Sequence, residues 1–274
     1  MASNPTLTLN DGRAIPQVGY GCWQIPDEQA PDLVGQALKA GYRLIDTAAA
    51  YGNEVGVGKG LRESGLPRED IFLTTKIWND RQGPDAAKAF EESRLKLGLD
   101  YIDLYLIHWP CPQRRLFVET WKAMIALREE GKVRSIGVSN FTDEHLAILV
   151  GETGVTPTVN QIELHPYFQR TDARATDKTR GIVTESWSPL GRGQELKDPV
   201  IDAIAKAHGR TPAQVVLRWH VQIGCVVIPK SANPHRIVEN ISLFDFELSD
   251  DDMKKIDALD RDDGRIGPDP ATFC

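Results

Sequence analysis

The chain has 274 residues, of which 41% are hydrophobic and 26% are charged, and its formal net charge is −7. These values are typical of a globular protein that buries a full core, and the acidic balance argues against nucleic acid or an anionic membrane as a partner. No apolar run approaches the length of a membrane-spanning helix, and the start of the chain, residues 1–5, lacks the basic and apolar regions of a signal peptide. We therefore expect a cytoplasmic protein that binds small molecules.

The expected elements begin with a β-hairpin. Residues that alternate between polar and apolar flank Asn10-Asp11-Gly12, and Asp-Gly is a strong hairpin signal. After the hairpin, short apolar runs alternate with amphipathic stretches. The expected strands are 18–20, 44–45, 71–75, 101–107, 133–138, 159–164, 182–186 and 226–228. The expected helices are 31–40, 53–62, 84–97, 116–130, 143–150, 199–207, 212–222 and 234–243. Segment 170–180 offers only two alanines as an apolar face, so we expect its helix to be loose or irregular.

This alternation predicts an α/β fold, a (β/α)8 TIM barrel with an N-terminal β-hairpin cap, formed as one domain over residues 1–274. The alternative is a doubly wound sheet, which should carry a glycine-rich phosphate-binding fingerprint after an early strand. That fingerprint is missing from the sequence. The glycines of 56–60 fall in a helix-like stretch, and those of 191–193 lack a third glycine at the required spacing.

The four cysteines are scattered along the chain and form no C-x-x-C pair; they are Cys22, Cys111, Cys225 and Cys274. Metal ligation and a disulfide framework are therefore both unexpected. We interpret all four as free thiols and expect no metal site.

Four polar residues follow the ends of predicted strands: Asp46, Tyr51, Lys76 and His108. In a barrel the carboxyl ends of the strands converge on one mouth, so these side chains should be neighbours. An ammonium lowers the pKa of a nearby phenol, and Lys76, held by Asp46, would act in this way on Tyr51. His108 would donate a hydrogen bond to a carbonyl oxygen. The set predicts a site that protonates a carbonyl oxygen while the carbon accepts hydride.

Each of these residues also has a simpler interpretation when taken singly. Asp46 would cap a turn, Tyr51 would be an amphipathic residue at the surface, and His108 would make a structural hydrogen bond. Lys76 would be a solvated charge, or it would suit a Schiff-base aldolase, since barrels support many chemistries. The phenol and imidazole partners favour carbonyl reduction over the aldolase.

Five motifs in order resemble the aldo-keto reductase family over essentially the whole chain. They are GYRLIDTAAAYGNE at 41–54, LIHWP at 106–110, GKVRSIGVSNF at 131–141, NQIELHP at 160–166, and IPKS at 228–231 followed by RIVEN at 236–240. The resemblance implies that Tyr51 is the general acid, that Lys76 and Asp46 tune it, and that His108 orients the carbonyl.

The family binds NADPH without a Rossmann fold, which accounts for the missing glycine fingerprint. The resemblance implies that the nicotinamide carboxamide is held by Ser139, Asn140 and Gln161, with Trp187 stacked on the ring. It places the pyrophosphate at Ser188, Leu190 and Gly191, the 2′-phosphate at Lys230, Ser231 and Arg236, and the adenine at Glu239 and Asn240. Cationic side chains and the amino end of a helix starting at Pro234 suit a phosphate dianion. NADPH is therefore expected in preference to NADH.

Three tryptophans, Trp23, Trp78 and Trp109, follow predicted strands and would wall a substrate pocket, although one or two of them would otherwise only pack against loop backbone. The resemblance implies reduction of aldehydes and ketones, including dicarbonyls, keto-sugars and aromatic aldehydes, to alcohols. Residues 110–116, 191–198 and the tail after 260 look short against the mammalian members. The chain therefore resembles the bacterial branch with the 2,5-diketo-D-gluconic acid reductases, for which we expect broad specificity and weak affinity.

The family default is a monomer. A second class of function stays open, namely a cofactor-binding regulatory protein of the same fold with little turnover. The tail around residues 264–270 is too rich in turn residues to place from the sequence.

Overall fold

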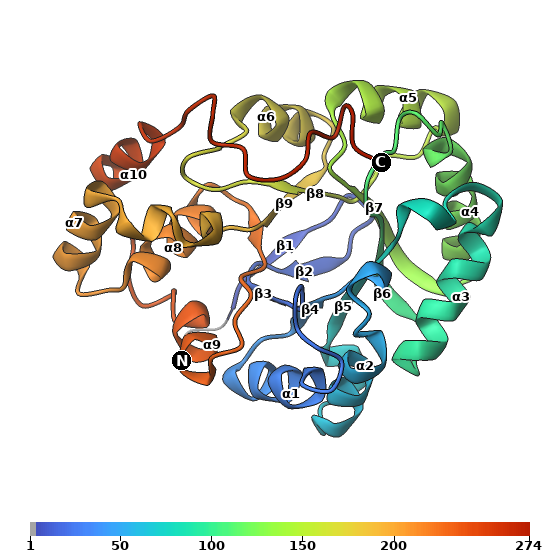
Figure 1. The fold of residues 1–274 in the computed structure, drawn as a ribbon, viewed down its shortest axis with the longest axis horizontal. Helices are drawn as coiled ribbons and strands as arrows, with labels where there is room; N and C mark the ends of the chain where they lie inside the picture. The colour runs from blue at the N-terminus through green and yellow to red at the C-terminus, as the bar shows by residue number, and fades with distance from the viewer. Residues whose placement is uncertain (1–3) are drawn as a thin grey trace.

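A parallel barrel forms the centre of the structure, a computed structural model that describes residues 4–274 (Figure 1). Residues 1–3, which belong to the stretch expected to lack a signal peptide, lie outside the described residues. Eight strands pair in sequence order, with bounds β3 Gly19–Gly21, β4 Leu44–Asp46, β5 Phe72–Ile77, β6 Ile102–Ile107, β7 Val133–Ser139, β8 Val159–Glu163, β9 Val183–Trp187 and β10 Val226–Val227. A parallel bridge between Val18 and Val227 joins the two ends of this sheet. The predicted (β/α)8 barrel is confirmed.

Helices surround the barrel on all sides in Figure 1. Their bounds are α1 Ala30–Ala40, α2 Glu54–Glu63, α3 Ala86–Leu97, α4 Phe117–Glu129, α5 Asp143–Thr153, α6 Thr171–Thr179, α7 Pro199–His208, α8 Pro212–Gln222, α9 Pro234–Ile241 and α10 Asp250–Asp257. Most predicted bounds agree within two residues. The sequence analysis missed α10, although Ser249 caps it in a capping box with Asp252. Within residues 4–274, no helix combines the length and the apolar character needed to cross a membrane.

The barrel strands are buried because helices cover them from outside and apolar side chains fill them from inside. All six residues of β6 are buried, for example, although Asp103 interrupts its apolar run. Arg68 pairs with this carboxylate at 2.5 Å, and the backbone N–H of Leu73 also donates to it. An acid is thus accommodated at the amino end of the strand, away from the barrel mouth.

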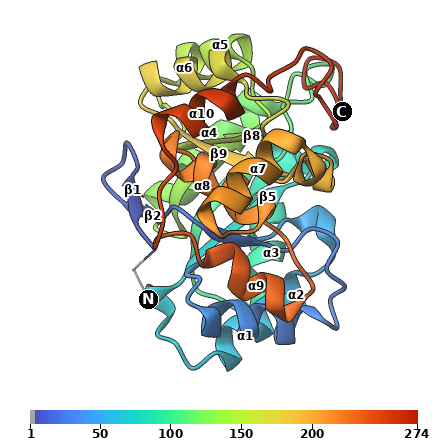
Figure 2. The same ribbon diagram turned by 90° about the vertical axis from the view of Figure 1, so that its left-hand side faces the viewer.

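An antiparallel hairpin caps the amino end of the barrel, as predicted. Its strands are β1 Thr6–Thr8 and β2 Ala14–Pro16. Leu9 and Ile15 are buried in one cluster with barrel residues, which are Leu44, Phe72, Leu104, Leu106, Val159, Val226 and Ile228. Figure 2 shows this hairpin and the C-terminal tail at opposite ends of the barrel. The hairpin closes one end, so only the other is available for a ligand.

The expectation of a loose helix at 170–180 is wrong, because α6 is a regular helix of nine residues. Its anchor is polar. Asp177 is fully buried, and its carboxylate accepts hydrogen bonds from Asn160 at 3.1 Å and from Thr184 at 2.9 Å. Both partners lie on barrel strands. Two charge-assisted hydrogen bonds hold this helix where an apolar face would normally do so.

The expectation of four free thiols is also wrong. Cys111 and Cys274 form a disulfide, although 163 positions separate them in the sequence. Cys22 and Cys225 are free and buried, as expected. The sequence contains no local signal for this bond, because only the path of the tail across the barrel mouth brings its two cysteines together.

Candidate active site

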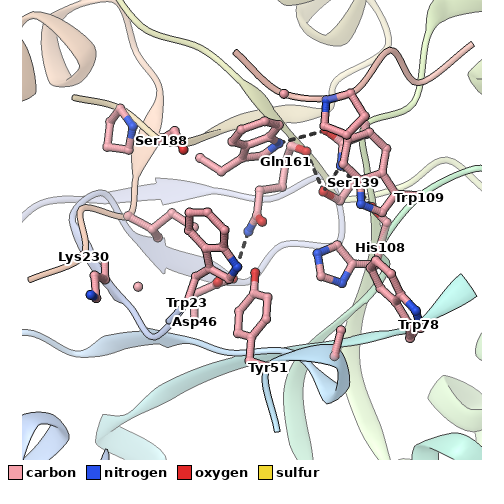
Figure 3. A pocket seen from close by; sticks show the side chains of 18 of the residues that line it. Trp23, Asp46, Tyr51, Trp78, His108, Trp109, Ser139, Gln161, Ser188 and Lys230 are labelled. Carbon is pink, nitrogen blue, oxygen red and sulfur yellow. Dashed lines mark hydrogen bonds between the residues drawn. The ribbon is translucent and has the colours of Figure 1, made fainter. Parts of the chain in front are cut away.

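A cavity of about 580 Å³ opens at the carboxyl end of the barrel strands (Figure 3). Its wall includes all three predicted tryptophans, Trp23, Trp78 and Trp109. Trp109 is only 7% exposed, whereas Trp23 is 42% exposed at the rim. Arg192 lies over the ring of Trp23, with 5.7 Å between the guanidinium carbon and the ring centroid. The cavity therefore has an aromatic wall, with the cation of Arg192 against the Trp23 ring.

At the base of the cavity, one ammonium contacts a carboxylate and a phenol. Lys76 on β5 donates to the Asp46 carboxylate at the end of β4 at 2.6 Å, and to the backbone oxygen of Thr47 at 2.9 Å. The same Nζ lies 3.4 Å from the hydroxyl of Tyr51, which follows β4 on a short 3₁₀ turn. Lys76 is fully buried. Three neighbouring elements thus bring together residues that the sequence predicted to be neighbours.

The direction of the Tyr51 pKa shift differs from the prediction. Burial raises the pKa of the phenol to about 12 and outweighs the opposing effect of the Lys76 ammonium. Burial opposes the charge of Lys76 as well, but Asp46 and Tyr51 more than compensate and raise the pKa of the ammonium. The sequence suggested the charge of Lys76 but not the extent of burial. At neutral pH the phenol therefore carries its proton and the lysine is charged.

His108 stands beside Tyr51 and lines the same cavity. Its ring makes edge contacts with Tyr51 at 5.7 Å and with Trp78 at 5.0 Å between centroids. Burial, with the nearby Lys76 charge, holds the pKa of this histidine well below its usual value. Its Nδ1 is buried without a hydrogen-bond partner among the described residues. The imidazole is therefore neutral, and Figure 3 shows that it points into the cavity with Tyr51.

A second buried carboxylate, Glu185 on β9, lies below these groups and was missed by the sequence analysis. The side-chain amide of Gln161 bridges the two acids, donating to Asp46 at 2.8 Å and to Glu185 at 3.0 Å. Burial, and then the charge of Asp46, raise the pKa of Glu185 to about 8. The only sequence signal was an acid in the middle of a predicted strand. These bonds turn the amide nitrogen of Gln161 toward the carboxylates.

Polar side chains from β7, β8 and β9 form another wall of the cavity. Ser139 donates to the backbone oxygen of Gln161 at 2.8 Å, and the amide nitrogen of Asn140 donates to the backbone oxygen of His108 at 3.0 Å. The indole N–H of Trp187 donates to the amide oxygen of Asn140 at 2.8 Å. Together with Ser188, these predicted residues all line the cavity. Their contacts fix the orientation of one indole and two amides.

Two predicted residues after β9 lie outside the cavity wall. Leu190 is half-buried and packs against the hydrophobic core. Gly191 is buried with φ of 51°, and a Cβ there would lie 1.6 Å from an oxygen of Glu195. Only glycine fits this position. Glu195 itself is fully buried and pairs with His165 at 2.5 Å.

The residues predicted to bind the 2′-phosphate and the adenine are spread over the loop after β10 and over α9. Lys230 is exposed and lines the cavity, whereas Ser231, Glu239 and Asn240 on this side do not. Glu239 accepts a hydrogen bond from Thr211 at 2.9 Å, and Asn240 is buried. Arg236 is exposed in the first turn of α9. The structure places one of these five residues at the cavity and the other four outside it.

The amino end of α9 is less free than the sequence suggested. The side chain of Asn233 accepts from the backbone N–H groups of His235 and Arg236 at 2.9 and 3.4 Å. These two donors are therefore capped internally, and the attraction of this region for an anion depends on the side chains of Lys230 and Arg236.

Further wall residues come from the tail, which the sequence could not place. Gly267, Pro268 and Phe273 line the cavity. The ring of Phe273 packs against Trp109 with 4.6 Å between centroids. No local pattern in the tail pointed to this position. The cavity thus combines a protonated phenol, an ammonium, a neutral imidazole and aromatic walls, a set suited to binding and protonating a small carbonyl compound.

Comparisons with known proteins give matches over nearly the whole chain. The model of the aldo/keto reductase family matches residues 16–261. An aldo-keto reductase of Mycolicibacterium smegmatis is 57% identical over 271 residues, 98% of both chains, and the methylglyoxal reductase DkgA of Escherichia coli K12 is 50% identical over 274 residues, 99% of both. The crystal structure of a Gox0644 mutant in complex with NADPH has a TM-score of 0.96 at 50% identity and covers 99% of each chain.

Proposed function

We propose, from the premise that this chain belongs to the aldo/keto reductase family, that it reduces aldehydes and ketones to alcohols with Tyr51 as the general acid. The family uses NADP(H), and the chain is an NADP-dependent oxidoreductase. Dicarbonyl compounds such as methylglyoxal are the proposed substrates, by analogy with the methylglyoxal reductase relative. Keto-sugars and aromatic aldehydes fit the same aromatic wall. The observation that carries the proposal is the Asp46–Lys76–Tyr51 contact at the base of the cavity.

The chain's own groups supply the proton. NADPH, when bound, provides the hydride for the carbonyl carbon. Tyr51 donates its phenolic proton to the carbonyl oxygen, and the phenolate left behind lies beside the Lys76 ammonium, 3.4 Å away in the structure. Asp46 holds that ammonium in place. The raised pKa of Tyr51 keeps the proton available at neutral pH, while the lysine charge stabilises the product of the transfer.

His108 orients the substrate in this proposal. Because its Nδ1 is buried without a partner, Nε2 is the ring nitrogen that meets a carbonyl oxygen. A neutral imidazole donates one hydrogen bond from Nε2 without placing a second cation beside Lys76. The low pKa of His108 therefore supports its role as an orienting donor and leaves the proton transfer to Tyr51.

The residues present fit the cofactor. Ser139, Asn140 and Gln161 offer polar groups for a carboxamide. Trp187 lines the same cavity with its indole held by the bond to Asn140, and it would stack on the nicotinamide ring. The pyrophosphate would follow Ser188, Leu190 and Gly191. The 2′-phosphate would meet Lys230, Ser231 and Arg236, and the adenine would meet Glu239 and Asn240. Two cations at the phosphate position favour NADPH over NADH.

The test is Tyr51→Phe, which removes the phenolic proton and keeps the ring. Turnover of methylglyoxal, phenylglyoxal, an aromatic aldehyde and 2,5-diketo-gluconate, followed by NADPH absorbance, should fall about 10²- to 10⁴-fold. The dissociation constant of NADPH, measured by fluorescence, should stay the same. Tyr101→Phe is a matched control, because Tyr101 directly precedes β6 at the opposite end of the barrel. Unchanged turnover in Tyr51→Phe would contradict the proposed acid.

The second candidate function is a cofactor-binding regulatory protein with little turnover. It predicts tight NADPH binding and no reduction of any substrate in the panel by the unaltered chain. The intact arrangement of Asp46, Tyr51, Lys76 and His108 favours the enzyme. We further propose that residues 1–274 act as one domain and as a cytoplasmic monomer, for which size-exclusion chromatography should give a mass near 30.4 kDa.

A further inference from the structure

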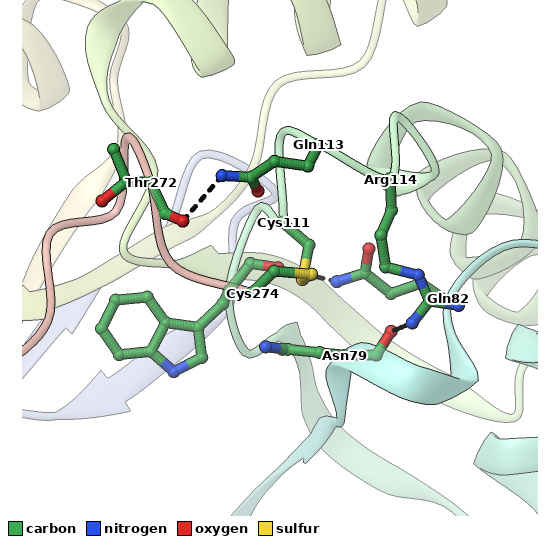
Figure 4. Close-up of a disulfide and its surroundings, with 8 residues drawn as sticks. Asn79, Gln82, Cys111, Gln113, Arg114, Thr272 and Cys274 are labelled. Carbon is green, nitrogen blue, oxygen red and sulfur yellow. Dashed lines mark hydrogen bonds between the residues drawn. A yellow bond between two sulfur atoms is a disulfide. The ribbon is translucent and has the colours of Figure 1, made fainter.

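The segment after α10 crosses the open end of the barrel (Figure 1) and ends at the Cys111–Cys274 disulfide (Figure 4). Cys111 is buried in the loop after β6, whereas Cys274 is exposed. Trp109, two residues before Cys111, and Phe273, next to Cys274, are both cavity-wall residues. Their rings pack together at 4.6 Å between centroids. The disulfide therefore joins the two backbones that carry one aromatic corner of the cavity.

The tail has a second anchor at Glu163, the last residue of β8. The carboxylate of Glu163 accepts from the backbone N–H groups of Ile266 at 2.6 Å and Gly267 at 2.8 Å. Gly267 is also tightly packed, because a Cβ there would come within 2.4 Å of the Trp187 ring. This anchor holds the tail up to Gly267 by contacts that do not involve the disulfide.

Beyond Gly267, the tail has few other attachments. In residues 268–274, Pro270 is buried and Phe273 is half-buried, and the others are exposed. Gln113 donates to the backbone oxygen of Thr272 at 2.7 Å, but this bond is exposed to solvent. A solvent-exposed hydrogen bond contributes little net stability. The disulfide is therefore the principal constraint on this end of the tail and on the position of the Phe273 ring.

We propose that the Cys111–Cys274 disulfide is a redox-controlled clamp that sets substrate specificity by holding Phe273 against Trp109 as part of the cavity wall. The inference rests on the proposed carbonyl reductase function. When the clamp is oxidised, the wall is complete, and aromatic carbonyl substrates gain the Phe273 contact. When it is reduced, residues 268–274 move away from the mouth. Tyr51, Lys76, Asp46 and His108 are held by strands β4 to β6 and keep their geometry in both states.

The redox step balances with a dithiol as reductant. A thiolate of the dithiol attacks the sulfur of Cys274, the exposed residue of the pair, and Cys111 leaves as a thiolate. The second thiol of the reductant then attacks the mixed disulfide and releases the Cys274 thiolate. Both cysteines take up a proton, and the reductant loses two electrons and becomes a disulfide. A disulfide oxidant of the same class reverses the reaction. In reducing compartments, disulfides are usually transient and either catalytic or redox-sensing.

The first measurement establishes the bond and its mechanical effect without using turnover. Denatured, unreduced protein should show two reactive thiols, from Cys22 and Cys225, and four after reduction with dithiothreitol. Amide hydrogen exchange of residues 268–273 should become faster on reduction, while that of the barrel strands stays the same. Four thiols after treatment with a disulfide oxidant, or equal exchange in both states, would overturn the clamp.

The second measurement tests specificity in the oxidised and reduced full-length protein. On reduction, KM for phenylglyoxal should rise about 2- to 10-fold, the factor that corresponds to losing one aromatic contact. Values of kcat and KM for methylglyoxal should change little, because this substrate is too small to fill the Phe273 corner. Equal phenylglyoxal kinetics in both states, with turnover present, would overturn the clamp alone. Absence of turnover in both states would instead contradict the proposed function.

Three variants separate the bond from the ring. Cys274→Ser, at an exposed position, should reproduce the reduced kinetics and no longer respond to dithiothreitol. Phe273→Ala should raise KM for phenylglyoxal with the disulfide still formed. Cys225→Ala, a free cysteine outside the cavity wall, should respond to dithiothreitol like the unaltered protein. A Cys274→Ser protein with the oxidised kinetics would contradict the proposal.

Discussion

Glu185 illustrates how burial changes the chemistry of a single residue. Its pKa is raised from 4.5 to about 8 by burial and then by the Asp46 carboxylate. Between these two pH values the folded chain holds a proton that the unfolded chain releases. The free energy of unfolding should therefore contain a contribution that decreases as pH rises through this window. This acid destabilises the fold at alkaline pH, yet its bond to Gln161 orients an amide at the proposed cofactor site.

Glu185→Gln should remove that dependence, because glutamine keeps the shape and the acceptor oxygen but does not ionise. We expect the free energy of unfolding, measured by urea denaturation, to decline less steeply than in the unaltered protein between about pH 5 and pH 8. Equal slopes for the two proteins would show that Glu185 does not titrate in this range.

Glu163→Gln is a matched comparison with the opposite sign. Burial favours the protonated acid, but the bonds from His165, Ile266 and Gly267 prevail and lower the pKa of Glu163. A lowered pKa contributes stability above the unfolded value, and this stability is lost as pH falls through the folded value. We expect Glu163→Gln to lose stability at neutral pH and to approach the unaltered protein in acid. A loss that persists undiminished in acid would contradict this assignment.

At the scale of elements, α6 shows that a polar anchor can replace an apolar face. Most of its side chains are polar, and Asp177 is its only fully buried residue. The carboxylate joins β8 through Asn160 and β9 through Thr184. Since these strands carry Gln161 and Glu185, the anchor of α6 also supports the base of the cavity.

Asp177→Ala should leave the side chains of Asn160 and Thr184 without their buried acceptor. We expect a loss of about 2 to 4 kcal/mol in the free energy of unfolding, since two buried donors lose their partner. Lys178→Ala, at an exposed position in the same helix, should change stability by less than about 0.5 kcal/mol. Chemical denaturation of both proteins provides the measurement. Similar losses in the two variants would show that the anchor is not Asp177.

At the scale of the whole molecule, the apolar cluster under the hairpin and the groups proposed for catalysis lie at opposite ends of the barrel. The hairpin and its apolar cluster close the amino end, and the cavity occupies the carboxyl end (Figure 2). The two regions share the barrel strands but no side chains of the proposed catalytic set. A change at the closed end should therefore affect the fold and leave the chemistry of the folded protein intact.

Ile15→Ala tests this separation, because Ile15 is fully buried in the cluster below the barrel. We expect a loss of about 2 to 5 kcal/mol in the free energy of unfolding, with kcat unchanged well below the melting temperature. Thr8→Ala, at an exposed position in the same hairpin, is the control and should have little effect. A large fall in kcat for folded Ile15→Ala would show that the two ends are coupled.

The sequence by itself determined the barrel, its hairpin cap and the neighbourhood of Asp46, Tyr51, Lys76 and His108. Apolar runs alternating with amphipathic stretches are local signals, and parallel strands in sequence order bring residues at their carboxyl ends to one mouth. The motif resemblance also indicated the correct family, which the comparisons confirm. The roles of the individual site residues remain predictions for the variants described above.

Only the tertiary structure decided the features that depend on distant parts of the chain. The Cys111–Cys274 bond and the position of Phe273 in the cavity wall exist because the tail folds back over the barrel mouth. The turn-rich sequence of the tail does not predict that path. The raised pKa of Tyr51 reflects burial by neighbours from several strands. The order in α6 comes from a carboxylate reaching two strands. Hydrophobic periodicity is a property of adjacent residues, whereas desolvation and cross-linking depend on which distant residues meet in space.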